Sequence, residues 1–273
     1  MPELPEVETI VRGLAPRVAG RRVASVWGSR LPLRLARPVA LGQLRSIAVE
    51  RRIETVTRRG KYILLATGGG AGVSVHLGMS GRLRLQPARE PRPAHTHVVF
   101  ELDGGDELRF IDPRRFGSVT PARDLTALPE LALLGPDPLS ELDAAELARR
   151  LRGVRAPIKA FLLDQRRIAG LGNIYVSEAL HRAAIHPGTR AGAVERRAVA
   201  LLDGIRGALE SGLANRGTTL RDYVDDAGTE GGNQHALLVY GRDGLPCPRC
   251  GKTVRRRVDS ARATFFCPGC QRR

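Results

Sequence analysis

Pro2, the second residue of the chain, could act as a nucleophile once Met1 is removed. Its small size allows that removal, which would leave a secondary amine at the terminus. Such an amine can form a Schiff base with an aldehyde-like carbon, as catalytic lysines do. It titrates near ~8, so about a tenth of it is neutral at pH 7 without further activation. The carboxylate of Glu3 is adjacent in the chain, although these residues also suit an ordinary capped helix.

Four cysteines near the C-terminus have the spacing of a zinc site. Cys247 and Cys250 form one pair, Cys267 and Cys270 form the other, and sixteen residues separate the pairs. Four thiolates close the coordination shell of Zn²⁺, so we expect one structural ion rather than a catalytic one. Two disulfides are the alternative, but they suit a secreted protein, and the N-terminus lacks the charged start of a signal peptide.

A glycine-rich turn at residues 170–173 is typical of a phosphate-binding element, although glycine turns also occur without that function. Asn173 is placed to cap the following helix, whose first amides could bind a phosphate. Lys159 lies just upstream and is one of only three lysines among the 44 basic residues, with Lys61 and Lys252. A lysine kept where arginine is used almost everywhere indicates a site that needs a compact or exchangeable charge.

Two predicted strand ends carry side chains that suit insertion into a nucleic acid. Glycines on both sides of Met79 favour an exposed loop tip, although a methionine more often belongs to a core. Exposed apolar tips act as wedges in DNA-bending proteins. Arg114 and Phe116 end another strand with a cation, an aromatic ring and a turn glycine.

The chain has a net charge of +16, from 44 basic and 28 acidic residues. This balance favours a polyanionic partner, most commonly nucleic acid, over a basic protein without such a partner. No stretch approaches the ~18 to 20 apolar residues of a membrane span, so we expect a cytoplasmic protein rather than a membrane protein.

The hydrophobic pattern predicts an α+β fold in which an N-terminal helix packs on a β-sandwich or barrel. Apolar residues at helical spacing follow Pro5 as far as Val18. Short alternating segments, the last two joined by a hairpin turn at 103–106, then predict strands at 62–65, 73–77, 82–85, 98–102 and 107–111. A proline-rich passage at 129–138 marks the end of this part.

The rest of the chain is predicted to be helical, with a zinc-held β-hairpin at its end. Helices are expected from Ser140, from Pro157, over 174–184 and over 194–215, with a mobile acidic loop over 221–234. The hairpin strands are expected at 253–258 and 263–266 with a turn at 259–261, and the hairpin is too small to fold without metal. We therefore predict three domains: a β-sandwich domain at 1–135, a helical DNA-binding domain at 136–236 and a zinc-finger hairpin at 237–271.

Seven short motifs, in the right order, resemble the bacterial formamidopyrimidine-DNA glycosylases over nearly the whole chain. They lie at 2–8, 60–62, 76–81, 112–117, 134–139, 172–175 and 239–242. The zinc hairpin, with Arg262 to Phe265, completes the resemblance. Residues 172–175 resemble the family's helix–two-turns–helix element.

The resemblance implies a bifunctional DNA glycosylase and AP lyase of base excision repair that removes oxidised purines. The Pro2 amine would attack the sugar C1′ and displace 8-oxoguanine or a formamidopyrimidine. Glu3 would act as the acid on the sugar, and Lys61 would aid proton transfer. The Schiff base would acidify the neighbouring carbon, so that the strand breaks by β- and then δ-elimination. Arg262 is implied in the last step, as a phosphate-binding and charge-stabilising group.

The resemblance also implies which residues contact damaged double-stranded DNA. Met79, Arg114 and Phe116 would fill the gap left by the flipped base. Lys159, Asn173 and Arg262 would clamp the phosphate at the lesion. Further backbone contacts would come from His76, His95 and Arg155. We expect a monomer with one structural Zn²⁺ that works on the bacterial nucleoid in the cytoplasm.

One segment departs from the family's pattern. Residues 229–235 carry Asn233 where many relatives have an aromatic residue just before the glutamine, and in this family the loop can cover the flipped base. An endonuclease VIII-type specificity for oxidised pyrimidines is therefore an alternative, although that sister group lacks the trio of Met79, Arg114 and Phe116. A non-catalytic zinc-finger DNA-binding protein is the alternative from another class.

Overall fold

A computed structural model describes residues 1–29, 31–33, 38–259 and 261–272 of the chain. Two compact units make up the chain. Unit 1 consists of Met1–Ala132 and Asn215–Gly232, and unit 2 consists of Leu133–Ala214 and Asn233–Arg273. The domain boundaries predicted from the sequence, after residues 135 and 236, remain a prediction.

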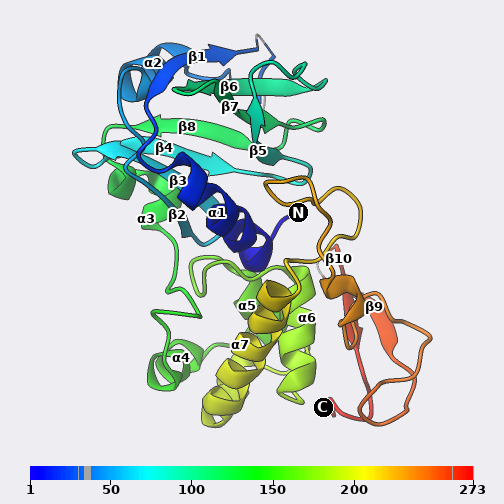
Figure 1. The fold of residues 1–273 in the computed structure, drawn as a ribbon. Coiled ribbons are helices and arrows are strands. Elements are labelled where there is room, and N and C mark those ends of the chain that lie inside the picture. Colours follow the sequence, from blue (N-terminus) through cyan, green and yellow to red (C-terminus); the bar gives the residue numbers. More distant parts are fainter. Residues whose placement is uncertain (30, 34–37, 260, 273) are drawn as a thin grey trace. The chain divides into compact units, whose positions relative to one another are not determined.

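Unit 1 contains two four-stranded antiparallel sheets. Its strands are β1 (Val23–Gly28), β2 (Thr55–Arg59), β3 (Tyr62–Gly68), β4 (Ala71–His76), β5 (Arg82–Pro87), β6 (Thr96–Leu102), β7 (Asp106–Ile111) and β8 (Ser118–Ala122). The strand orders are β1-β6-β7-β5 and β2-β3-β4-β8. Figure 1 shows the two sheets as separate layers. With the helices described below, they confirm the predicted α+β fold and β-sandwich.

Helix α1 (Leu4–Val18) packs on β2 and completes the core of unit 1. Its buried face repeats at helical spacing through Val7, Ile10, Leu14 and Val18, and one hydrophobic cluster joins it to both sheets. Burying each such side chain stabilises the fold by roughly 1.5–3 kcal/mol. The remaining helices of unit 1 are α2 (Leu41–Ala48), the 3₁₀-helix η1 (Leu125–Ala127) and α3 (Pro129–Ala132).

The segment Asn215–Gly232 is anchored on α1 within unit 1. The backbone N–H of Thr218 donates to Glu6 Oε1 at 2.7 Å, and Arg17 forms an ion pair with Asp226 at 3.2 Å. Gly13 makes room for this ion pair, because a Cβ at residue 13 would lie 2.0 Å from Asp226 Oδ1. The mobility expected for residues 221–234 remains a prediction.

Unit 2 is built on packed helices. They are α4 (Ala144–Leu151), α5 (Ile158–Leu163), α6 (Asn173–Arg182), the 3₁₀-helix η2 (Ala191–Arg197), α7 (Ala198–Ala214) and the 3₁₀-helix η3 (Asn233–His235). Helices α6 and α7 lie side by side in Figure 1, and Gly204 allows their close approach. A Cβ at Gly204 would lie 2.6 Å from the carbonyl oxygen of Ala179.

The helix expected from Ser140 begins later than predicted. Its N-cap is Asp143, whose side chain accepts a hydrogen bond from the backbone N–H of Glu146 at 2.7 Å. An aspartate at this position satisfies a donor that the first turn leaves open. Since Asp143 supplies the cap, helix α4 starts at Ala144.

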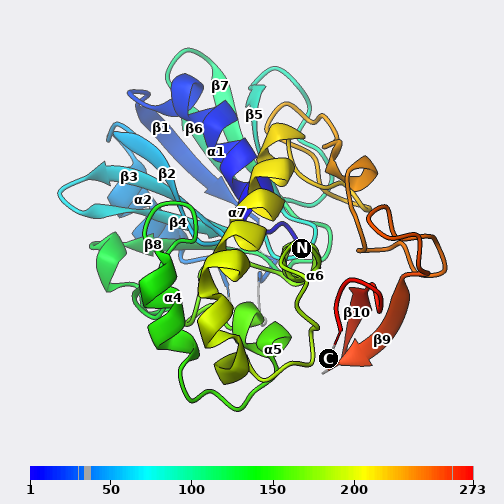
Figure 2. The same cartoon turned by 90° about the horizontal axis from the view of Figure 1, so that it is seen from below.

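The end of the chain forms the antiparallel hairpin of β9 (Arg255–Asp259) and β10 (Arg262–Phe266). Figure 2 shows it at the opposite end of unit 2 from α4. A small cluster of Val239, Val254, Phe265 and two cysteines forms its core. Ser260, in the predicted turn, lies outside the described residues. Throughout the described part of the chain, every helix is too short or too polar to cross a membrane.

Candidate functional site

Buried charged side chains surround the N-terminal amine of unit 1. Met1 is present here, so the nitrogen of Pro2 is an amide and the free amine is one residue away from the predicted nucleophile. Burial lowers the pKa of the Met1 amine, the charges of Glu3 and Glu6 raise it, and Lys61 lowers it. Glu3 and Lys61 are only 4% and 6% exposed. The structure therefore brings both predicted catalytic side chains of this unit to the terminus.

Glu6 fixes the backbone of this terminus, a role that the sequence did not predict. Its Oε2 accepts a hydrogen bond from the Glu3 N–H at 2.8 Å, while its Oε1 holds Thr218. Glu3 and Glu6 together form a capping box. That three-residue spacing was the available signal, whereas the charge of Asp222 near the amine could not be predicted from the chain order.

Asp112 joins the two loops of unit 1 that carry the predicted wedge residues. It is fully buried, and its Oδ1 accepts a hydrogen bond from Ser80 Oγ at 2.6 Å. Its Oδ2 accepts one from the N–H of Gly117 at 2.8 Å. One carboxylate therefore holds both loops in place, and its role was not predicted from the sequence.

Met79, Arg114 and Phe116 are presented by these two loops. Met79 and Phe116 are 40% and 48% exposed, which fits loop tips rather than core positions. The Arg114 guanidinium lies over the Phe116 ring, 5.0 Å from its centre. Gly78 has a φ of +62°, and a Cβ there would lie 2.4 Å from the carbonyl carbon of Phe116. The loops thus approach each other closely because residue 78 is glycine.

His76 and His95 adjoin the same loops. His76 is 9% exposed, its Nδ1 accepts a hydrogen bond from the Gly78 N–H at 3.1 Å, and its ring packs on Tyr62. His95 is exposed, and its carbonyl oxygen accepts a hydrogen bond from the N–H of Asp112 at 3.0 Å. Both residues predicted to contact the DNA backbone therefore lie next to the loops that carry Met79 and Phe116.

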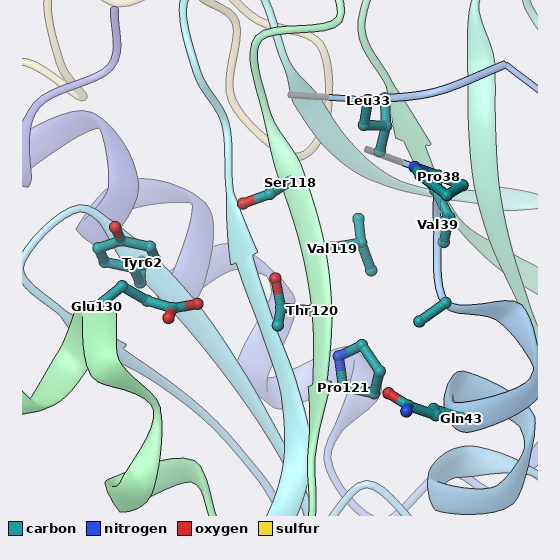
Figure 3. A pocket seen from close by; sticks show the side chains of 11 residues that line it. Leu33, Pro38, Val39, Gln43, Tyr62, Ser118, Val119, Thr120, Pro121 and Glu130 are labelled. Atoms are coloured by element: carbon teal, nitrogen blue, oxygen red, sulfur yellow. The ribbon is translucent and has the colours of Figure 1, made fainter. Parts of the chain in front are cut away.

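A separate pocket of about 430 Å³ in unit 1 contains none of the predicted site residues. In Figure 3, Ser118 and Thr120 of β8 point to one side of the strand, whereas Val119 and Pro121 point to the other. The described lining includes one carboxylate, Glu130, and no lysine or arginine. This chemistry does not suit a polyanion.

In unit 2, Lys159 and Asn173 meet at one carbonyl group of the hairpin. Lys159 Nζ lies 2.8 Å from the carbonyl oxygen of Ala263 and 2.6 Å from Thr264 Oγ1. Asn173 Nδ2 donates to the same carbonyl at 2.9 Å. The contact places both beside Arg262, the exposed first residue of β10. The three predicted clamp residues are therefore neighbours.

The prediction that Asn173 caps its helix is wrong. The N-cap of α6 is Gly172, and no side chain provides the cap hydrogen bond. The amide of Asn173 instead points to Ala263, 90 residues away in the sequence. Asn173 therefore helps to position the hairpin.

Burial lowers the pKa of Lys159 to about 8. Asp259 opposes this shift, whereas Arg262 and Arg257 strengthen it. All four side chains line a pocket of about 530 Å³, in which a bound anion would favour the charged lysine. Arg155, also predicted as a contact, is exposed in the segment before α5.

The four cysteines form a cluster that fits one zinc ion. Their sulfur atoms all lie within 4.8 Å of one another, with Cys247 and Cys270 at 3.9 Å and Cys250 and Cys267 at 3.4 Å. A tetrahedral ion bonded at ~2.3 Å to each thiolate places its ligands ~3.8 Å apart. When bound, zinc supplies folding energy and has no open position for substrate.

Helix α6 also anchors the chain that leads into the zinc cluster. Glu178 is buried and accepts hydrogen bonds from the backbone N–H groups of Leu238, Val239 and Tyr240 at 2.8–2.9 Å. Burial raises the pKa of this carboxyl group, and the three donors oppose the shift. Glu178 was not predicted from the sequence, because its role depends on contacts about 60 residues away.

Three family models match successive parts of the chain. Residues 1–119 match the formamidopyrimidine-DNA glycosylase N-terminal domain, and residues 134–224 match its H2TH domain. Residues 244–273 match a zinc finger found in FPG and IleRS. Together with the sulfur cluster, the last match confirms one structural zinc ion.

The chain is also similar to named proteins over its full length. It is 47% identical to the formamidopyrimidine-DNA glycosylase of Stenotrophomonas maltophilia, covering 100% of both chains. The crystal structure of MutM (Fpg) from Thermus thermophilus is 42% identical, with a TM-score of 0.85 and coverage of 99% of this chain and 98% of that one. Lactococcus lactis Fpg in complex with N7-benzyl-Fapy-dG containing DNA is 33% identical, with a TM-score of 0.89 and full coverage of both chains.

Proposed function

Because the chain belongs to the family of formamidopyrimidine-DNA glycosylases, we propose that its chemistry starts at the amine of Pro2. The membership confirms the resemblance and identifies a DNA-binding base excision repair enzyme that acts on oxidised purines. The observation that carries the proposal is the set of buried charges around the terminus, which includes Glu3, Glu6 and Lys61. Glycosylase and lyase chemistry both need a reactive amine there.

In the first step the neutral Pro2 amine donates its electron pair to C1′ of the damaged nucleotide. The bond from C1′ to the base breaks, and the base leaves with the electron pair of that bond and takes up a proton from solvent. Glu3 takes the proton from the Pro2 nitrogen after the attack and passes it to the ring oxygen O4′ as the bond from C1′ to O4′ breaks. The product is an iminium ion between Pro2 and C1′. Burial and the positive charge of Lys61 both favour an unprotonated amine, as they do for the amine of Met1.

The iminium ion then drives strand cleavage. It withdraws electrons from C2′, so that loss of a C2′ proton expels the 3′ phosphate. Loss of a C4′ proton expels the 5′ phosphate in the second elimination. We assign Lys61, a buried and exchangeable amine, as an aid to the transfer of these protons. Arg262 is assigned to stabilise the leaving phosphate.

The remaining predicted residues bind DNA. Flipping the damaged base costs a few kcal/mol, and Met79, Arg114 and Phe116 offset this cost by occupying the gap. Lys159, Asn173 and Arg262 bind the phosphate of the lesion. His76, His95 and Arg155 add backbone contacts that carry no sequence information.

We propose that formamidopyrimidines and 8-oxoguanine are removed in preference to oxidised pyrimidines. The support is the trio at 79, 114 and 116, since Lactococcus lactis Fpg has been solved with DNA containing either N7-benzyl-Fapy-dG or an oxidised pyrimidine. Asn233, at the atypical loop position, is 2% exposed and its Oδ1 accepts a hydrogen bond from Ser211 Oγ at 3.0 Å. The side chain is therefore fixed within unit 2.

Excision kinetics on matched duplexes test this specificity. Single-turnover rates should be at least about 10-fold higher for 8-oxoguanine than for thymine glycol, since pocket contacts of this kind discriminate by ~1–3 kcal/mol. An abasic duplex serves as the control, because it reports the lyase step without base recognition. Faster excision of thymine glycol would instead assign the chain the pyrimidine specificity.

Lys159→Arg should remove a pH dependence of DNA binding. In the DNA-free protein the pKa of Lys159 is about 8, and a bound phosphate raises this pKa. The affinity of the wild type for DNA is therefore greatest below pH 8 and falls as the pH rises through 8. Because one charged contact is lost, the affinity for DNA should decrease about 10-fold between pH 7 and pH 9.5. Arginine stays protonated, so the slope should flatten in the variant whatever its affinity at pH 7. Fluorescence anisotropy at constant ionic strength measures both curves, and an unchanged slope contradicts the assignment.

We propose a monomer that acts on the bacterial nucleoid in the cytoplasm. Every group assigned above belongs to one chain, so no second copy is needed to complete the chemistry. Zinc-bound thiolates suit a reducing compartment, which is also where bacterial chromosomal DNA lies. Sedimentation of the protein with and without duplex DNA tests the monomer.

A further inference from the structure

We propose that His181 is an additional positioning residue of the zinc site, which it serves by donating a hydrogen bond to the thiolate of Cys247. It lies in the last turn of α6, and its Nε2 is 3.4 Å from Cys247 Sγ. Both residues are buried, at 1% and 2% exposure. The proposal concerns metal retention and goes beyond the glycosylase chemistry.

The surroundings of the imidazole decide which nitrogen carries the proton. A zinc-bound thiolate has no hydrogen to donate, so Nε2 must be the donor in this contact. His181 Nδ1 is buried and has no hydrogen-bond partner within the described residues. A hydrogen on Nδ1 would leave an N–H unsatisfied there and would leave Nε2 without a hydrogen to donate to the thiolate. The geometry therefore favours the neutral tautomer with its hydrogen on Nε2.

This hydrogen bond stabilises the charged form of one ligand. A donor to a thiolate disperses its negative charge and holds the sulfur in one orientation, which helps the ligand to stay on the metal. Cys247 is one of the two cysteines shielded from solvent, while Cys250 is exposed. His181 thus protects the inner part of the metal site, where water cannot replace a lost hydrogen bond.

The same helix links the ion to the phosphate clamp. Asn173 at the start of α6 contacts Ala263, Glu178 holds residues 238–240, and His181 contacts a zinc ligand. Helix α6 therefore contacts the C-terminal segment 237–271 at three positions. Glu178 contacts only backbone groups of the segment and no sulfur atom. A substitution of Glu178 is therefore a control for weakened packing of the segment on α6.

Zinc release from the full-length, zinc-loaded protein tests the proposal. A chromogenic chelator in excess should remove zinc about 10-fold faster from His181→Phe, which fills the space without a donor, than from the wild type. His181→Gln keeps an N–H donor and should fall between them. The proposal would be overturned if His181→Phe released zinc at the wild-type rate while its melting temperature was unchanged.

The cobalt-substituted proteins separate a direct effect on sulfur from altered packing. Loss of the hydrogen bond should shift the thiolate-to-cobalt charge-transfer band of His181→Phe, whereas Glu178→Gln should leave the band in place. Identical bands in the wild type and in His181→Phe would overturn the proposal even if zinc loss were faster. This spectrum can be recorded without DNA and does not depend on the assignment of Pro2.

Discussion

Protein that retains Met1 is expected to cleave abasic DNA on the order of 10³-fold more slowly than protein that begins at Pro2. With Met1 in place the Pro2 nitrogen is an amide, whose electron pair is delocalised into the carbonyl group. The primary amine of Met1 is then displaced by one residue, about 3.8 Å along the chain. A misplacement of ~1 Å can already cost 10²-fold in rate, so the displaced amine should not compensate.

Borohydride trapping on an abasic duplex measures this difference directly. The processed protein should give a covalent adduct, and protein with uncut Met1 should give little. Pro2→Gly, processed to a primary amine at the same position, is the matched control and should trap more than the uncut form. Equal trapping by the uncut and processed proteins would assign the nucleophile to another side chain.

Cys247→Ser should lose zinc and weaken DNA binding by at least about 100-fold. The hairpin core contains only a few buried residues, and the apparent free energy of structural zinc binding, ~10–16 kcal/mol, is largely free energy of folding in such modules. Without the folded hairpin, Arg262 and the Ala263 carbonyl lose their positions beside Lys159. The clamp should therefore fail as a unit.

Metal analysis and anisotropy binding test this prediction together. Wild-type protein should contain one zinc ion per chain, and Cys247→Ser should contain little. Lys252→Arg is the matched control, since it changes a residue close to Cys250 without removing a zinc ligand or a charge. Unit 1 has its own core, so part of the cooperative melting should survive in the variant. Wild-type affinity in a zinc-free variant would contradict the role given to the hairpin.

The elements that the sequence predicted well are those with a strong local pattern. The apolar repeat from Val7 to Val18 and the alternation in β3 to β7 each specify their own periodicity. The cysteine spacing specifies a metal site without any knowledge of the fold. These features need no distant partner to be recognised.

Strands β1, β2 and β8 were not predicted, and the local signals of β2 and β8 are weak. The β2 sequence, Thr55 to Arg59, contains a single buried apolar residue, Val56. Pro121 lowers the strand signal of β8, yet β8 is an edge strand that pairs only with β4, where a residue without an N–H is tolerated. Pairing with neighbouring strands stabilises these segments as strands although their own sequences do not specify one.

The positioning residues were missed for a different reason. Glu6, Asp112, Glu178 and His181 act through partners that lie far away in the sequence or on another loop. Their residue types were visible, but nothing in the chain order indicates which groups they meet. Asn173 shows the converse error, since a plausible local role as a cap was replaced by a distant contact.

The central claim, that Pro2 is the nucleophile, is tested most directly by locating the trapped adduct. The borohydride-reduced complex should be digested with nuclease and trypsin, and the modified peptide sequenced by tandem mass spectrometry. We predict a sugar remnant on the terminal nitrogen of the peptide Pro2–Arg12, with no modification of the lysines. A remnant on Lys61 or Lys159 instead would contradict the account.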